Sequence, residues 1–140
     1  MPKQIEIAIE IIFHATEDNK KIFEPILELF QLKEEEFTHE KILGYYGNPI
    51  TLTKIVLTKE KAENFIRELI SRISKPQLEE LVENISVYFD ESSLFLRIGK
   101  NDLVRSIISL QQNDAVKIRI KVPIYKKSEL AKTYTELLKV

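Results

Sequence analysis

Polar and apolar residues alternate along several stretches of the chain, and a period of two is typical of β-strands with one covered face. Residues 4–13 read QIEIAIEIIF, with isoleucine or phenylalanine at every odd position. The stretch VKIRIKV at 116–122 repeats the pattern. Residues 85–89 and 93–98 alternate as well, with a polar Asp-Glu-Ser-Ser turn between them. We therefore expect two single strands and one hairpin in these stretches.

A second hairpin is predicted from two β-like segments, 37–46 and 50–57, which flank the sequence Gly-Asn-Pro. A short glycine-containing loop between two such segments is typical of a hairpin turn. We expect Gly47 to adopt a positive φ at this corner, Gly44 to permit a bulge and Pro49 to set the entry of the next strand. The two glycines are thus explained first by backbone geometry.

Apolar residues three and four apart predict helices between the strands. The clearest helix runs from Ala62 to Ile73 after Thr58, and a second follows Ser74, which can cap it. Further helices are expected after Thr16, which can cap the first of them, in a short stretch over 103–108 and at 130–138. Strands with one apolar face interleaved with amphipathic helices imply an α+β fold. We expect a single, mainly antiparallel sheet with helices packed on one face, formed as one domain over residues 1–140.

Composition excludes several functional classes. The chain has 140 residues and no cysteine, which excludes disulfides, zinc–thiolate sites and thiol nucleophiles. No apolar run resembles a signal peptide or a membrane span, so we expect a cytoplasmic protein without a membrane partner. The net charge is −1, from 21 basic and 22 acidic residues. Any attraction to nucleic acid must therefore come from a local cluster of charges.

Catalytic chemistry finds little support in the sequence. His14 and His39 are the only histidines, and His14 stands four residues before Asp18. That spacing suits a metal-ligand pair on a helix, but a metal site needs a third and a fourth ligand. Three roles stay open for His14: a strand-end residue bonded to the backbone, a nucleic-acid contact, or a catalytic or metal-binding group. Because glycine-rich phosphate loops and nucleophile motifs are missing, we expect no enzyme activity, no metal and no cofactor.

The strongest candidate site is the sheet face that the helices leave open. If the apolar residues of VKIRIKV point to the core, its three cations share the opposite face. The same alternation places two aromatic rings and an arginine there, so the predicted set is Tyr88, Phe95, Arg97, Lys117, Arg119 and Lys121. Rings stack on unpaired bases and cations neutralise phosphates, so this combination suits RNA. Glu6 and Glu10 share the face, and ion pairs with them would explain the cations without any ligand.

Three motifs also resemble those of a small, largely archaeal family of RNA-binding proteins and predicted exosome subunits. They are HATED at 14–18, GYYGNPI at 44–50 and LFLRIGKN at 94–101, and the resemblance extends from the first strand to VKIRIKV. It implies a fold similar to that of the ribosomal large-subunit protein that binds five-S RNA, with a curved sheet. The matching positions are His14, Glu17, Asp18, Gly44, Tyr46, Gly47, Asn48, Pro49, Arg97 and Lys100, and the resemblance adds Lys100 to the predicted RNA-binding residues. Gly99 and Asn101 depart from the family pattern, which has Asp and Gln there.

Two hypotheses follow from different functional classes. The first is a non-catalytic RNA-binding protein, an accessory factor in RNA processing or degradation, whose partners are single-stranded or irregular RNA and exosome or ribosomal components. The second is a protein-interaction subunit whose open face docks a partner or forms a homodimer. A surplus of positive charge on the open face favours the first hypothesis, and neutralisation by Glu6 and Glu10 favours the second.

Overall fold

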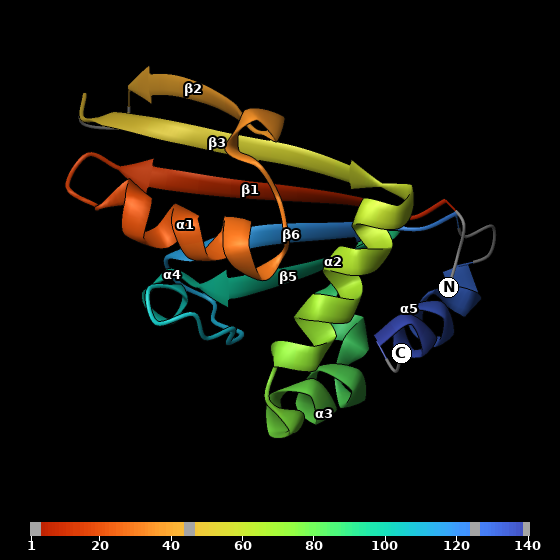
Figure 1. Cartoon of the computed structure of the whole chain (residues 1–140). Helices are drawn as coiled ribbons and strands as arrows, with labels where there is room; N and C mark the ends of the chain where they lie inside the picture. The colour runs from red at the N-terminus through yellow and green to blue at the C-terminus, as the bar shows by residue number, and fades with distance from the viewer. Residues whose placement is uncertain (1–3, 44–46, 124–126, 139–140) are drawn as a thin grey trace.

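The computed structural model describes residues 4–43, 47–123 and 127–138. Its six strands form one antiparallel sheet in the order β2-β3-β1-β6-β5-β4 (Figure 1). The strands are β1 (Glu6–His14), β2 (Thr38–Leu43), β3 (Pro49–Thr58), β4 (Phe89–Asp90), β5 (Ser93–Gly99) and β6 (Ala115–Lys121). The predicted α+β class and the antiparallel sheet are thereby confirmed.

Five α-helices accompany the sheet, and Figure 1 shows α1 and α2 lying across one of its faces. They are α1 (Asn19–Leu29), α2 (Lys59–Arg72), α3 (Lys75–Glu83), α4 (Lys100–Leu103) and α5 (Leu130–Leu138). Three 3-10 turns complete the described elements: η1 (Glu34–Glu36), η2 (Ile85–Tyr88) and η3 (Lys127–Glu129). Within the described ranges, no helix is long and apolar enough to cross a membrane.

The core lies between the sheet and the helices that cover it. In β1 the odd-numbered residues are buried and the even-numbered residues are not, as the period of two requires. On the helix side, Phe65, Ile66 and Leu69 of α2 supply fully buried side chains to the same cluster. Tyr134 fixes α5 to this core, because its hydroxyl donates to the carbonyl oxygens of Ser92 at 2.8 Å and Ile120 at 3.0 Å.

Two local predictions are wrong. Residues 85–88 form the 3-10 turn η2 and not a strand, so the second hairpin keeps only the two residues of β4 on that side. Ile85 and Phe89 are four residues apart, a spacing that satisfies one helical turn as well as an alternating strand. The short helix expected over 103–108 lies earlier, as α4, and the chain turns at Ser106 with a φ of 58°.

Helix starts also differ in detail from the prediction. Asp18, and not Thr16, caps α1, because its carboxylate accepts a hydrogen bond from the backbone N–H of Lys21. Ser74 caps α3 as expected, by accepting from the backbone N–H of Gln77 at 3.4 Å.

The sheet ends in two different edges. On one side, β4 contributes only two residues. On the other side, β2 is six residues long and exposed along its whole length. The open face, by which we mean the side of the sheet opposite the helices, extends between these edges.

Candidate functional site

Strand register sets the order of side chains on the open face. The β5–β6 ladder places Phe95 opposite Arg119 and Arg97 opposite Lys117, and Lys121 lies opposite Ser93. The basic half of the open face is therefore one contiguous patch, made of Phe95, Arg97, Lys117, Arg119 and Lys121. All five side chains are exposed. The structure thus brings together five of the residues that the sequence assigns to this face.

The remaining strands give the open face a second half of different character. Ala8 and Ile12 of β1 lie opposite Val56 and Leu52 of β3, and Ile42 of β2 lies opposite Ile50. We call these six residues the apolar half: Ala8, Ile12, Ile42, Ile50, Leu52 and Val56. Val56 is 56% exposed and Ile42 is 38% exposed, so this half is accessible to a ligand or a partner.

Acidic residues lie between the two halves but leave the basic half unpaired. In the sheet, Glu10 stands between Lys54 of β3 and Lys117 of β6. Its carboxylate forms an ion pair with Lys54 at 4.0 Å. Across the part of the chain that the structure describes, no ion pair involves any cation of the basic half. Glu6 lies opposite Lys121 in the same sheet, but neither Glu6 nor Glu10 forms an ion pair with a cation of the basic half, and such pairs would have explained these cations without a ligand.

A groove lies at the β4 end of the basic half. Its volume is about 380 Å³, and Phe95, Arg97 and Lys117 line it together with Tyr88 and Asp90. Tyr88 reaches the groove from η2, where its hydroxyl donates to the Glu80 carboxylate at 3.2 Å. Burial, reinforced by that hydrogen bond, raises the pKa of the Tyr88 phenol. Tyr88 is thus brought beside Phe95 as predicted, although from a turn and not from a strand.

Lys100 is placed in a different environment from the other predicted cations. Its side chain is 2% exposed, and its ammonium contacts the Glu17 carboxylate at 3.0 Å and the Asp114 carboxylate at 3.1 Å. The same ammonium donates to the backbone carbonyl of Ile12 and lies 5.9 Å from the centre of the Phe13 ring. A buried ammonium with this many partners is a structural group, so we leave Lys100 out of the proposed binding surface.

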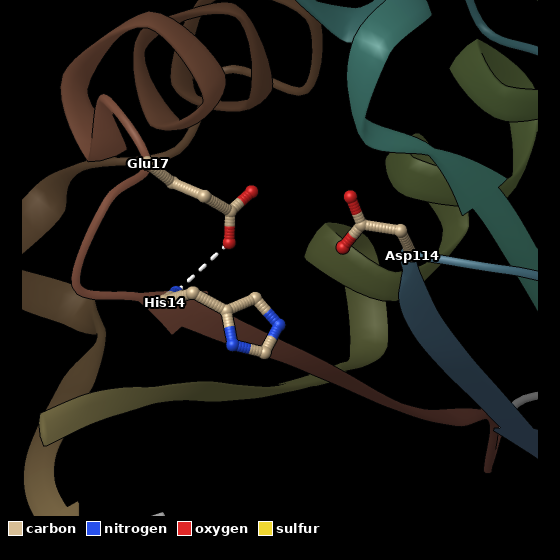
Figure 2. A group of neighbouring side chains, drawn as sticks. All are labelled: His14, Glu17 and Asp114. Atoms are coloured by element: carbon tan, nitrogen blue, oxygen red, sulfur yellow. Dashed lines mark hydrogen bonds between the residues drawn. The ribbon is translucent and has the colours of Figure 1, made fainter. Parts of the chain in front are cut away.

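His14 stands beside the two carboxylates that hold Lys100 (Figure 2). Its backbone N–H donates to Glu17 Oε1 at 2.8 Å, which ties the end of β1 to the turn before α1. Ligand atoms of His14, Glu17 and Asp114 lie within 4.8 Å of one another, a spacing that a metal ion could bridge. The Lys100 ammonium already neutralises both carboxylates, so a metal would have to displace it. This geometry favours the structural role of His14.

The GYYGNPI corner is described in part. Gly47 has a φ of 78°, which confirms the predicted positive φ, and an added Cβ there would meet no atom within 4 Å. The requirement for glycine is therefore conformational and not steric. Pro49 begins β3 opposite Leu43, as a hairpin requires, and Asn48 is exposed beside it. The predictions for Gly44 and Tyr46 fall outside the described residues.

Gly99 is packed closely by the end of an exposed side chain. A Cβ added there would lie 2.4 Å from the Gln111 side chain, which packs against the glycine. The backbone N–H of Gly99 donates to the Ser109 carbonyl at 2.9 Å, so this end of β5 is tied to the following loop. Glycine in place of the Asp of the family pattern thus leaves room for the Gln111 side chain.

A second hollow, of about 360 Å³, lies on the helix side between α1 and the β2–β3 hairpin. His39 and Thr53 line it, and the His39 Nδ1 atom is 2.9 Å from the Thr53 hydroxyl. Thr53 is fully buried, and the His39 ring stacks edge-on against Phe23 at 5.8 Å. A buried hydroxyl bonded to its nearest polar neighbour is typical of a satisfied core contact. Sequence analysis missed this pair because the two residues are brought together only by the register of β2 and β3.

Comparison with known proteins assigns a family to most of the chain. Residues 6–122 match the model of a protein family described as RNA binding. An RNA-binding protein from Pyrococcus abyssi is 29% identical over 141 residues, which cover 94% of this chain and 92% of that protein. The family match ends one residue beyond β6, so α5 lies outside it.

Solved structures agree with the fold. A protein from Archaeoglobus fulgidus is 27% identical and superposes with a TM-score of 0.83, over 96% of this chain and 99% of its own. A protein from Sulfolobus solfataricus is 22% identical and superposes with a TM-score of 0.75, over 96% of this chain and 97% of its own. The order of strands and helices described above is therefore shared with archaeal proteins.

Proposed function

This chain belongs to an RNA-binding family, and from that premise we propose that it binds single-stranded or irregular RNA on the basic half of its open face. One observation carries the proposal. The cations of the basic half form no ion pair among the described residues, whereas Lys54, one strand beyond β1, is paired with Glu10. Unpaired cations in a row neutralise phosphates without first breaking an internal contact.

The geometry of the patch supports a single strand over a duplex. Phe95 is 38% exposed and lies among the cations, where a flat ring is available to an unstacked base. In a duplex the bases are already stacked on each other, so an aromatic ring of this kind is of little use there. Stacking and phosphate contacts together are typical of sequence-tolerant binding to single strands.

The proposal describes a binder and not a catalyst. The basic half consists of cations and a phenyl ring, which hold RNA but supply neither a nucleophile nor a general base. The Asp90 carboxylate of the adjoining groove has no serine, threonine, cysteine or histidine nucleophile beside it among the residues that line the groove. A protein of this kind acts as an accessory factor in RNA processing or degradation. Exosome or ribosomal components are the partners to test, by copurification of the chain with each assembly.

A second candidate function rests on the apolar half. Val56 and Ile42 expose apolar surface on either side of the Glu10–Lys54 ion pair, and such a surface suits a protein partner or a second copy of the chain. In that case the open face is a docking surface, and Phe95 is an anchor within it. Light scattering of the purified protein at several concentrations separates a monomer from a dimer formed through this face.

The decisive experiment measures RNA affinity by fluorescence anisotropy at several salt concentrations. We expect Lys117→Glu combined with Arg119→Glu to weaken binding strongly and to flatten the salt dependence, by roughly 0.7 in log–log slope for each lost phosphate contact. A matched control reverses two exposed lysines of the helices, Lys21 and Lys75. If both double variants bind as the parent does, the basic half is not the RNA site. If the parent binds nothing at low salt, the docking function replaces this proposal.

A further inference from the structure

The groove at the β4 end of the basic half has an internal order of chemical groups. Asp90 lies opposite Ser93, and along β5 the next residues on the open face are Phe95 and then Arg97. Lys117 lies opposite Arg97 at the far end. Successive residues on one face of a strand are about 7 Å apart. A carboxylate, an aromatic ring and a pair of cations thus follow one another along the groove.

This order fits one nucleotide of a single strand. The cations at one end attract a phosphate, and the exposed Phe95 ring in the middle offers a stacking surface for the attached base. Val87, which is 77% exposed, adds an apolar wall beside Tyr88. A strand that places its phosphate on Arg97 and Lys117 brings the edge of its base towards Asp90.

The Asp90 carboxylate can distinguish base edges by the hydrogen-bond donors that they present. A carboxylate only accepts hydrogen bonds, and it repels a phosphate that comes close to it. Among the ion pairs of the described residues none involves Asp90, so the carboxylate is available to a ligand. On its Watson–Crick edge guanine presents two adjacent donors, N1–H and N2–H₂, which match the two oxygens of a carboxylate. Uracil presents one donor between two carbonyl oxygens, which repel the carboxylate.

We infer that this groove holds one unpaired base of the bound RNA and selects guanine through Asp90. The inference rests on the proposed function, because the cations of the basic half must first hold the strand. It adds a base preference to a surface whose other contacts are independent of sequence. Adenine and cytosine each offer a single amino group to the carboxylate, so we place their affinities between those of guanine and uracil.

The test uses oligouridine strands of about nine nucleotides, within the site sizes of single-strand binders, with guanine, adenine, cytosine or uracil at the centre. We expect the guanine strand to bind about tenfold more tightly than the all-uridine strand, as a good bidentate contact allows. A single guanine in uridine also avoids self-association of the strand. Equal affinities for all four strands, with a normal salt dependence, overturn the inference and leave the proposed function intact.

Two isosteric variants assign the preference to one carboxylate. Asp90→Asn replaces one acceptor oxygen by a donor, so we expect the guanine preference to fall to within about twofold, with the salt slope unchanged. Glu91→Gln removes the same charge one residue away, outside the lining of the groove, and keeps the preference. If Asp90→Asn retains the tenfold preference, the inference is wrong. If no strand binds at low salt, the proposed function and the inference fail together.

Discussion

Two groups of cations beside β5 and β6 lie in opposite environments. Lys100 follows directly after β5, is 2% exposed and contacts Glu17, which stands 83 residues earlier in the chain. Lys117 and Arg119 lie on β6, are exposed, and form no ion pair with a described residue. The side chains carry the same charge, but one is paired inside the protein and the others face solvent.

This difference separates a structural charge from a charge that is available for binding. A buried ammonium is stable only with its partners, so removing it leaves uncompensated carboxylates and a free carbonyl. An exposed cation contributes little to folding, because water solvates it in both the folded and unfolded states. Such a cation is free to attract a ligand, which under the proposed function is the RNA backbone. A cation beside a sheet therefore indicates a binding function only where it has no acidic partner within the protein.

The largest effect is expected from Lys100→Met. We expect this change to lower the free energy of unfolding by about 3 kcal/mol, because the Glu17 and Asp114 carboxylates and the Ile12 carbonyl all lose their contact with the ammonium. Urea unfolding measures it. The matched change Lys117→Met removes an exposed cation and should alter stability by less than about 0.5 kcal/mol. RNA affinity should fall more in Lys117→Met than in Lys100→Met. Equal losses of stability from both variants would refute the distinction between the two environments.

A smaller effect is expected from a neutral group within the basic half. Phe95→Ala should weaken RNA binding by about 2 kcal/mol, which is about thirtyfold, because a stacking surface is lost. The salt slope should stay the same, since stacking releases no counterions. Val56→Ala, at an exposed apolar position on the other half, is the control and should leave RNA affinity unchanged. A changed salt slope in Phe95→Ala would show that the ring acts by positioning the cations and not by stacking.

The smallest effect tests the boundary between the two halves. Glu10→Gln removes the partner of Lys54 and a carboxylate that stands beside Lys117. We expect RNA to bind about threefold more tightly, with the salt slope steeper by up to roughly 0.7, because one more cation becomes available to a phosphate. Glu40→Gln, at the far edge of the sheet, provides the matched loss of charge. Weaker binding in Glu10→Gln would mean that this carboxylate orders the cations and does not mask one.

Local patterns were sufficient for most of the fold. The alternation in β1 and β6 and the three-four spacing in α2 depend on neighbours in sequence, so these elements were predicted correctly. The positive φ of Gly47 followed from the hairpin around it in the same way. The η2 turn was missed because five residues are too few to separate a period of two from a single helical turn.

Alternation predicted which side chains of each strand lie on the open face, but not which side chains of different strands lie side by side. Alternation placed Lys117 and Arg97 on the open face, but their position opposite each other depends on the order of the strands. The ion pair between Glu10 and Lys54 depends on the same order of strands. Lys100 joined the predicted RNA-binding residues through the family resemblance and not through alternation, and a motif match does not tell whether a side chain is buried. Its burial results from contacts with segments distant in sequence, which no local pattern contains.

The exposed edge strand β2 bears on whether two copies of this sheet can join edge to edge. An added antiparallel strand places each residue opposite one that shares its face of the sheet. Pairing all six residues of β2 with their copies would set Glu40 opposite Lys41, but these two residues lie on different faces, so the pleat forbids that register. The nearest permitted registers set Glu40 against Glu40 or Lys41 against Lys41. Like-charge pairs thus disfavour antiparallel pairing of two copies at the longer free edge of the sheet.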